Sequence, residues 1–160
     1  MIHINIICVG KIKETYLKDA INEYTKRLSK YTNLKIIELA DEKIKNNSSL
    51  KEEILIKNKE GQNILNNIKK DSYIICLDLK GKQYTSEEFS QKIDNISLTG
   101  NSSITFIIGG SLGLSEEILT EANELISFSK MTFPHQLFRV FLLEQIYRAF
   151  KISNNETYHK

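Results

Sequence analysis

The chain has 160 residues, 41% of them hydrophobic and 26% charged, and this composition excludes a disordered or fibrous protein. A chain of this length fits one domain, which can bury a sizeable core without disulfides or metal ions. The net charge is only +2, and residues 101–160 carry 5 basic against 6 acidic side chains, which excludes a basic nucleic-acid-binding tail.

The first half of the chain alternates between apolar runs typical of buried strands and apolar stripes typical of helices. Residues 2–9 predict a strand and residues 14–30 a helix, because apolar side chains recur at helical spacing in the latter. A second strand is expected at 34–39, followed by a polar loop. Ser48 or Ser49 is a candidate N-cap for the next helix, since a serine side chain accepts hydrogen bonds from the unpaired N–H groups there.

The second half continues the same alternation. A strand is expected at 72–79, and the sequence of 85–88, Thr-Ser-Glu-Glu, is typical of a helix start. Further strands are expected at 103–108 and 125–128, and Pro134 begins a long helix that ends near Ile152. The pattern predicts an α/β fold in one domain, with a mostly parallel sheet covered by helices on both faces.

Cys8 and Cys76 lie inside the apolar runs of two predicted strands, so we expect buried, reduced thiols. No CxxC pair and no cluster of histidine and cysteine suggests a metal site. The N-terminal apolar run is too short for a secretion signal, and no apolar run approaches the ~20 residues of a membrane span. We therefore expect a cytoplasmic protein that binds neither a membrane nor a metal ion.

The stretch Gly109–Gly113 directly follows a predicted strand, and Ser115 caps the short helix after it. Ligands of parallel sheets bind at such carboxyl ends of strands, where glycine lets them approach the backbone. The GxGxxG and GK[ST] phosphate-binding motifs are absent. The stretch matches G-x-S-x-G, the nucleophile elbow of hydrolases with Ser111 as nucleophile, although the chain is small for that fold and the oxyanion motif is missing. A tight turn without a ligand is the third interpretation.

A run of serine, threonine, lysine and aromatic residues, Ser127–Gln136, connects the last predicted strand to the last helix. Its backbone groups could hydrogen-bond the edge of a purine, with Phe128, Met131 and Phe133 forming an apolar slot around the ring. The same three side chains could instead simply anchor the connection to the core.

The last predicted helix is apolar around most of its circumference, which is more than one sheet face needs and favours a homodimer. Arg139 and Arg148 lie on this helix, and a buried arginine needs a partner or an anionic ligand. For Arg148 the partner could be Glu144, one helical turn earlier.

The chain ends in Tyr158-His159-Lys160, which together offer a stacking surface, a proton carrier and a cation. Chain ends usually fray, so the alternative is a tail without a fixed position.

Together these stretches resemble the SPOUT-class pseudouridine N3-methyltransferases of 23S ribosomal RNA, the ribosomal RNA large subunit methyltransferase H family. The resemblance covers essentially the whole chain, and the combination of motifs is highly specific although each one alone is not. The motifs are Val9–Lys13, Glu60-Gly61, Ile107–Gly113, Phe128–His135, Glu144–Phe150 and Tyr158–Lys160.

The resemblance implies a C-terminal trefoil knot, within about residues 104–152, that holds the cofactor S-adenosylmethionine in a bent conformation. It also implies a homodimer in which two subunits build each site. The implied substrate is one pseudouridine of the large-subunit ribosomal RNA, methylated at N3 in the assembled ribosome. A ribonucleoprotein offers shape as well as phosphates, which fits the modest net charge of the chain.

The resemblance also assigns residues. The family's cofactor positions, carried onto this chain, are Leu77, Gly109, Gly110, Gly113, Phe128, Ser129, Lys130, Met131, Thr132 and Phe133. Our candidates for catalysis are His159 as proton acceptor or positioner, Arg148 as stabiliser of developing negative charge and Tyr158 as orienting group. The candidate RNA contacts are His135, Arg139 and Lys160.

Two other classes of function stay open from the residues alone. One is a small serine hydrolase built on Ser111, with His135 or His159 as its base. The other is a non-catalytic ribosome-binding module that keeps the fold. Substitution of Ser111 by alanine tests the first, and calorimetry with S-adenosylmethionine tests the second.

Overall fold

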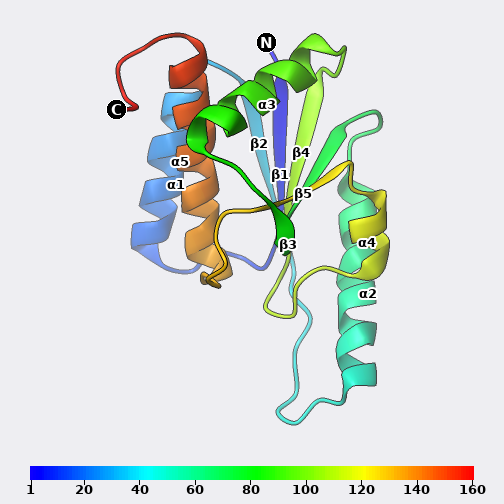
Figure 1. The fold of residues 1–160 in the computed structure, drawn as a ribbon. Coiled ribbons are helices and arrows are strands. Elements are labelled where there is room, and N and C mark those ends of the chain that lie inside the picture. Colours follow the sequence, from blue (N-terminus) through cyan, green and yellow to red (C-terminus); the bar gives the residue numbers. More distant parts are fainter.

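The computed structural model describes residues 1–160, and at its centre lies a five-stranded parallel sheet (Figure 1). The strands are ordered β2-β1-β4-β3-β5 across the sheet. Their bounds are His3–Val9 for β1, Asn33–Leu39 for β2, Tyr73–Gln83 for β3, Ser103–Ile108 for β4 and Glu124–Ser127 for β5. The helices are α1 Thr15–Leu28, α2 Leu50–Asn67, α3 Ser86–Leu98, α4 Glu116–Glu121 and α5 His135–Ser153. The α/β fold predicted from the sequence is confirmed.

Helices cover both faces of this sheet, and the side chains of the strands are sorted between the two faces. Successive side chains of a strand point to opposite sides. In β1, Ile4 and Ile6 pack into a buried cluster with α1, α3 and α5, whereas Ile7 and Val9 join a cluster with α2 and α4. Every residue of the central strand β4 is buried, which is typical of a parallel strand covered on both sides.

Three helices begin at capping side chains, as their sequences predict. Ser49 Oγ accepts a hydrogen bond from the Glu52 N–H (3.2 Å), and Ser115 Oγ accepts one from the first turn of α4 (3.4 Å). At the start of α3, Thr85 and Glu88 form a reciprocal capping box. Each cap satisfies an N–H group that has no partner inside the helix, and this fixes where the helix begins.

Strand β3 continues to Gln83, whereas the sequence predicted its end at Leu79. Its pairing with β5 shifts register before this last part. Gly81 lies there so close to the neighbouring strand that a Cβ atom would be 2.5 Å from the carbonyl carbon of Ile126. A single glycine inside a strand-like pattern is typical of a bulge or a close backbone approach, so Gly81 was the available signal for the longer strand.

Strand β5 is the last strand at one edge of the sheet, and β2 is the last strand at the other edge. Helix α5, which follows β5 in the chain, packs against α1 and α3 rather than beside β5 (Figure 1). The connection between them, residues 128–134, therefore runs back along the carboxyl ends of the strands. In Figure 1 it crosses the connection from β3 to α3. The part of β3 where the register shifts and the loops after β4 and β5 thus lie together beyond the paired carboxyl ends of the strands. No helix in the chain has both the length and the apolar character needed to span a membrane.

Candidate functional site

Residues 77–80 within β3 and the loops after β4 and β5 enclose a cavity of about 470 Å³, which we call the first cavity. This volume lies within the range of about 300–1,000 Å³ found for small-molecule sites. Every cofactor position predicted from the sequence lines it except Lys130, whose side chain is exposed. Sequence reasoning missed Lys80 and Ile126, which also line it. Their position at or near the ends of predicted strands was the available signal.

The glycine-rich loop of the first cavity needs glycine for two separate reasons. A Cβ atom on Gly109 would lie 2.9 Å from the carbonyl carbon of Gly113, because the loop folds back on itself. The Gly113 N–H donates to the Gly110 carbonyl oxygen at 3.0 Å and closes this turn. Gly113 has a φ of +85°, in the region that favours glycine, and the space beside its Cα is open. The loop therefore presents bare backbone to the cavity.

The aromatic loop that follows β5 forms the opposite wall. The ring centroids of Phe128 and Phe138 are 4.9 Å apart, and those of Phe133 and Phe138 are 6.3 Å apart and nearly parallel. Phe128 also packs against the main core, so the anchoring and the cavity-lining interpretations both hold for it. Met131, in contrast, is 73% exposed. The loop is shaped by its own hydrogen bonds, from Ser127 Oγ to the Ser129 carbonyl and from the Met131 N–H to Ser129 Oγ.

A second cavity, of about 300 Å³, adjoins the first. The two cavities share four lining residues, and these are Ile126, Ser127, Phe128 and Phe133. The other walls of the second cavity come from the start of α3 and the middle of α5, and its polar residues are Thr85, Ser86, Ser127, Glu144 and Gln145. The aromatic loop therefore separates the glycine-rich loop from a polar cluster on α5.

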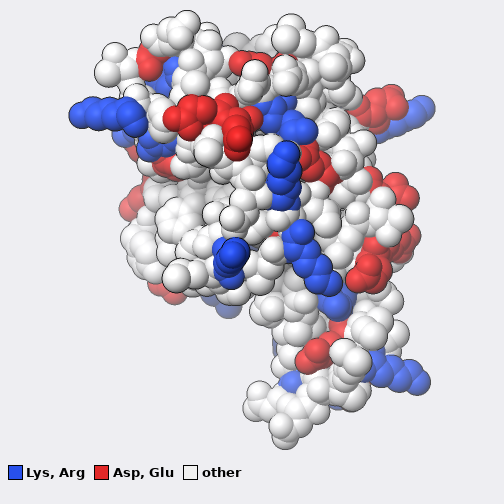
Figure 2. Space-filling model, viewed as in Figure 1, with Lys and Arg blue, Asp and Glu red and all other residues white.

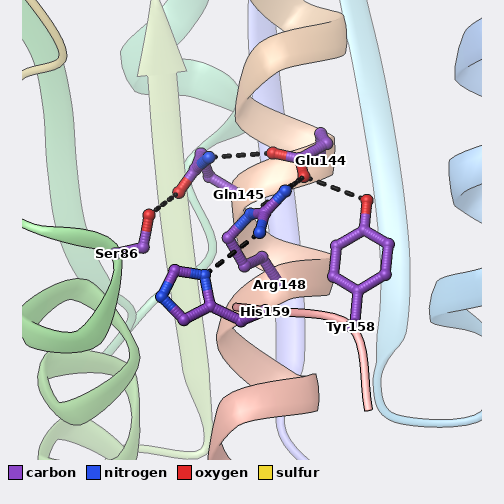
Figure 3. Close-up of polar contacts among 6 residues, drawn as sticks. All are labelled: Ser86, Glu144, Gln145, Arg148, Tyr158 and His159. Carbon is purple, nitrogen blue, oxygen red and sulfur yellow. Dashed lines mark hydrogen bonds and ion pairs between the residues drawn. The ribbon is translucent and has the colours of Figure 1, made fainter.

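Glu144 is the centre of this polar cluster (Figure 3). Its Oε1 accepts hydrogen bonds from Arg148 Nε (3.0 Å), Arg148 Nη2 (2.6 Å) and the Tyr158 hydroxyl (3.0 Å). Its Oε2 accepts one from Gln145 Nε2 at 2.8 Å, and Gln145 Oε1 accepts one from Ser86 Oγ at 2.8 Å. The hydrogen bond to Glu144 raises the pKa of Arg148 further, so the guanidinium is a permanent cation. The Arg148–Glu144 pair that the sequence suggested is present.

The C-terminal tail is docked on this cluster, with Tyr158 and His159 both in fixed contacts. His159 Nδ1 lies 3.1 Å from Arg148 Nη1, and His159 Nε2 lies 2.7 Å from Glu87 Oε1. A guanidinium only donates, so Nδ1 must accept, and Nε2 then carries the proton and donates to Glu87. This hydrogen bond lowers the pKa of Glu87. With its only acceptor nitrogen occupied, His159 is better suited to hold Arg148 in place than to accept a proton from a substrate.

Arg139 lies away from the cluster and inside the protein. Its side chain is 2% exposed, and Nη1 lies 2.8 Å from Glu38 Oε2. Nη2 donates to the carbonyl oxygens of Val9 and Gly10 at 3.2 and 2.6 Å. Both Nη atoms of the guanidinium are thus occupied by groups of the protein itself. These contacts favour a structural role for Arg139 over the RNA contact expected from the sequence. Lys160, the other basic candidate, is exposed.

His135 lines the first cavity at the start of α5. Burial, together with the positive charge of Arg139, lowers the pKa of its imidazole below the usual value of about 6.5. The unfolded chain therefore binds this proton more readily than the folded one. We expect the free energy of unfolding to fall as the pH is lowered through about 6.5, and His135→Gln to remove that part of the pH dependence. Thermal unfolding of both proteins at about pH 7.5 and about pH 5.5 measures it. Equal differences between the two pH values in both proteins would contradict the assignment.

Comparison with known sequences matches residues 2–159 to the family model described as "Predicted SPOUT methyltransferase". A protein of Clostridium botulinum strain Kyoto, named ribosomal RNA large subunit methyltransferase H, is 67% identical over 158 residues, which are 99% of each chain. A protein of Clostridium acetobutylicum with the same name is 64% identical over the same share of both chains.

Comparison with solved structures gives a more distant similarity. A protein from Haemophilus influenzae Rd KW20, described as a probable methylase family protein, superposes with a TM-score of 0.54 at 14% identity. The match covers 98% of this chain and 70% of that one. At this identity the similarity concerns the fold alone.

Proposed function

The chain belongs to the SPOUT methyltransferase family, and we propose that it transfers a methyl group from S-adenosylmethionine to N3 of a pseudouridine in large-subunit ribosomal RNA. The relatives named for methylation of that RNA match it over 99% of their length at 64–67% identity, which supports the same substrate. One structural observation carries the proposal. The first and second cavities share a wall, and Glu144, which lines the second cavity, contacts both Arg148 and Tyr158, so a donor and an acceptor of a methyl group could meet there.

The first cavity fits the cofactor in size and in chemistry. Its volume of about 470 Å³ suits a molecule of this size class. The glycine-rich loop offers backbone groups at close range, and Phe128 and Phe133 offer apolar surface for a purine ring. Ser129 and Thr132 add hydroxyl groups from the aromatic loop. S-adenosylmethionine, when bound, supplies an electrophilic methyl group.

The cluster on α5 would act on the RNA side of the reaction. Holding the acceptor nitrogen in line with the methyl group can lower the barrier by roughly 7–11 kcal/mol. Arg148, as a permanent cation, would stabilise the negative charge that the uracil ring gains when N3 releases its proton to water, before N3 takes the methyl group and the thioether leaves. Tyr158 would hold Arg148 from one side, since the Arg148 Cζ lies 4.7 Å from the centre of its ring. His159 would hold Arg148 from the other side, through the Nη1 contact at 3.1 Å.

The distribution of charge on the surface suits a large RNA partner that is bound through a few separate phosphate contacts. On the face in Figure 2, lysine and arginine side chains form a loose column down the middle, and acidic side chains gather at its margins. Lys80 lines the first cavity, Lys130 lies between two of its lining residues, and Lys82 lies over the ring of Tyr84; all three are exposed. None of the three forms an ion pair with a carboxylate. Unpaired, exposed lysines of this kind bind the phosphate groups of RNA. A ribosomal substrate would place the activity in the cytoplasm, where ribosomes are.

We also propose a knotted C-terminal segment and a homodimer. The return of the chain from β5 to α5, across the connection from β3 to α3, supports threading within about residues 104–152. The apolar side chains around most of the circumference of α5 and the exposed Met131 of the aromatic loop support a contact with a second copy. Light scattering tests the dimer, and a monomeric mass at assay concentration would contradict it.

Mass spectrometry of ribosomal RNA from cells with and without the gene for this chain tests the function. We expect one additional methyl group on a pseudouridine of the large subunit only when the chain is present. Ser111→Ala is expected to keep the methylating activity, whereas a serine hydrolase would lose its own. An absence of binding heat with millimolar S-adenosylmethionine would favour the non-catalytic ribosome-binding module and contradict the proposal.

A pair of matched glycine substitutions tests the cofactor site. Gly113 and Gly100 both have positive φ and open space beside Cα, so alanine is strained at each by about 1–2 kcal/mol. We expect both variants to lose stability to a similar extent in urea denaturation. Only Gly113→Ala is expected to weaken S-adenosylmethionine binding, by about tenfold or ~1.4 kcal/mol in calorimetry. Equal affinities in the two variants would contradict the placement of the cofactor.

A further inference from the structure

Beyond the wall that it shares with the first cavity, the second cavity has a selective lining. Aromatic side chains form most of its apolar wall, and these are Tyr84, Phe89, Phe128, Phe133 and Phe141. Its volume of about 300 Å³ lies at the lower end of the range for small-molecule sites. A flat ring that stacks on aromatic side chains fits such a space better than a flexible or strongly charged molecule.

The polar residues of this cavity have hydrogen-bonding capacity to spare. Glu144 Oε1 accepts three hydrogen bonds, but Oε2 accepts only the one from Gln145. The Gln145 amide uses one N–H toward Glu144 and its oxygen toward Ser86, which leaves its second N–H. A carboxylate acceptor and an amide donor therefore lie side by side on α5, at the cavity (Figure 3).

A uracil-type ring has a matching edge, because ring N–H donors alternate with carbonyl acceptors around it. An N–H of the ring would donate to Glu144 Oε2, and the neighbouring carbonyl would accept from Gln145 Nε2. Phe128 and Phe133 belong to both cavities, so a ring seated here has one side toward the methyl donor.

We propose that the second cavity is the subsite for the target base, a uracil-type ring, with Glu144 and Gln145 as its hydrogen-bonding residues and Phe141 as part of its stacking wall. This proposal rests on the proposed function and names the place of the acceptor within it. Arg148 is then positioned beside the ring by the same carboxylate that binds the ring, since Glu144 holds both.

Gln145→Leu tests the subsite, because it removes the amide and keeps the size of the side chain. We expect kcat for methylation of unmodified ribosomes to fall by about 10²-fold, since a misplaced ring loses its alignment with the methyl group. The KM for ribosomes and the Kd for S-adenosylmethionine are expected to stay within about twofold, because the ribosome is gripped elsewhere. Gln62→Leu, at an exposed amide on α2, is the matched control and should leave all three values unchanged.

Phe141 provides a second, independent variant pair. Phe141→Leu is expected to lower kcat, and Phe141→Tyr to keep it, because only the latter retains an aromatic face. Light scattering and thermal unfolding of both variants check that assembly and folding are unchanged.

The outcomes separate the two proposals. Wild-type activity in both Gln145→Leu and Phe141→Leu would overturn the subsite, while the methyltransferase function would stand. A loss of S-adenosylmethionine affinity equal to the loss of kcat would also overturn it, because the cavity would then hold part of the cofactor. If the wild-type protein methylates no ribosomal RNA, it is the proposed function that fails.

Discussion

Removal of Tyr158, His159 and Lys160 is expected to lower methylation of ribosomal RNA by about 10²-fold or more, with S-adenosylmethionine binding near normal. No residue of the tail lines the first cavity, so the cofactor site should persist without it. The tail does hold the cluster on α5. Tyr158 donates to Glu144, and its ring packs edge-on against Tyr147 with centroids 4.9 Å apart.

The loss follows from what happens to Arg148. With the tail present, the guanidinium is fixed by Glu144, by the ring of Tyr158 and by His159. Without the tail, only the pair with Glu144 within one helix remains, and such pairs contribute little when solvent reaches them. The arginine then samples several positions, and a developing charge on the base is no longer met by a preorganised cation.

Transfer of a labelled methyl group to ribosomes measures the activity of the truncated protein. Three further variants, measured in the same way, separate the contributions of Tyr158, His159 and Lys160. Deletion of Lys160 alone separates a phosphate contact from the docked tail: it should raise the KM for ribosomes and leave kcat near normal, because Lys160 is exposed. Tyr158→Phe removes only the hydroxyl bond to Glu144, and His159→Gln removes the imidazole that bridges Arg148 and Glu87. Normal rates in the three-residue truncation would show that the tail has no part in catalysis.

The sequence predicted the elements well because their signals are local. Apolar runs, helical stripes and the caps at Ser49, Thr85 and Ser115 depend on residues a few positions apart, and all of them lie where expected. The extension of β3 to Gln83 was missed because its cause is a contact between Gly81 and the backbone of another strand. Periodicity carries no information about such a contact.

Neither the second cavity nor the docked tail could be predicted from spacing. The cavity exists only because α5 returns from β5 to a place beside the start of α3, where Ser86 meets Gln145 at 2.8 Å. The sequence separation of these two residues gives no hint of this. The polar character of Glu144 and Arg148 on an apolar helix was visible, but their partners His159 and Ser86 depend on the three-dimensional arrangement. The cofactor loops could be predicted from the sequence because the carboxyl ends of parallel strands all lie at the same end of the sheet, where ligands bind.

Arg139 is where a plausible sequence interpretation and the structure lead to opposite experiments. An arginine that contacts RNA would be exposed, and its removal would weaken binding without affecting the fold. In the structure it joins α5 to the ends of β1 and β2, through Val9, Gly10 and Glu38. Glu38 Oε2 also accepts a hydrogen bond from the Ile12 N–H at 2.8 Å. The guanidinium therefore ties three segments together.

Arg139→Ala is expected to lower the free energy of unfolding by about 3 kcal/mol. Breaking a buried pair leaves one charge without its partner, which costs about 3–5 kcal/mol. The lower end applies because the Glu38 side chain is 37% exposed and can be hydrated in the variant. A loss of this size is a large fraction of the roughly 5–15 kcal/mol that stabilises an ordinary domain. Equilibrium denaturation in urea measures it.

The matched control is Arg27→Ala, which removes an arginine from a pair with Glu23 on the surface of α1. Both side chains of that pair are about half exposed, at 41% and 53%, so the expected loss is below about 1 kcal/mol. Arg139→Lys is informative as well, because a lysine keeps the charge but cannot reach Glu38 and both carbonyl oxygens at once. It should lie between the alanine variant and the wild type. If Arg139→Ala is as stable as the Arg27 control and loses only ribosome binding, the arginine contacts RNA after all, and the contacts with Glu38, Val9 and Gly10 contribute little to the fold.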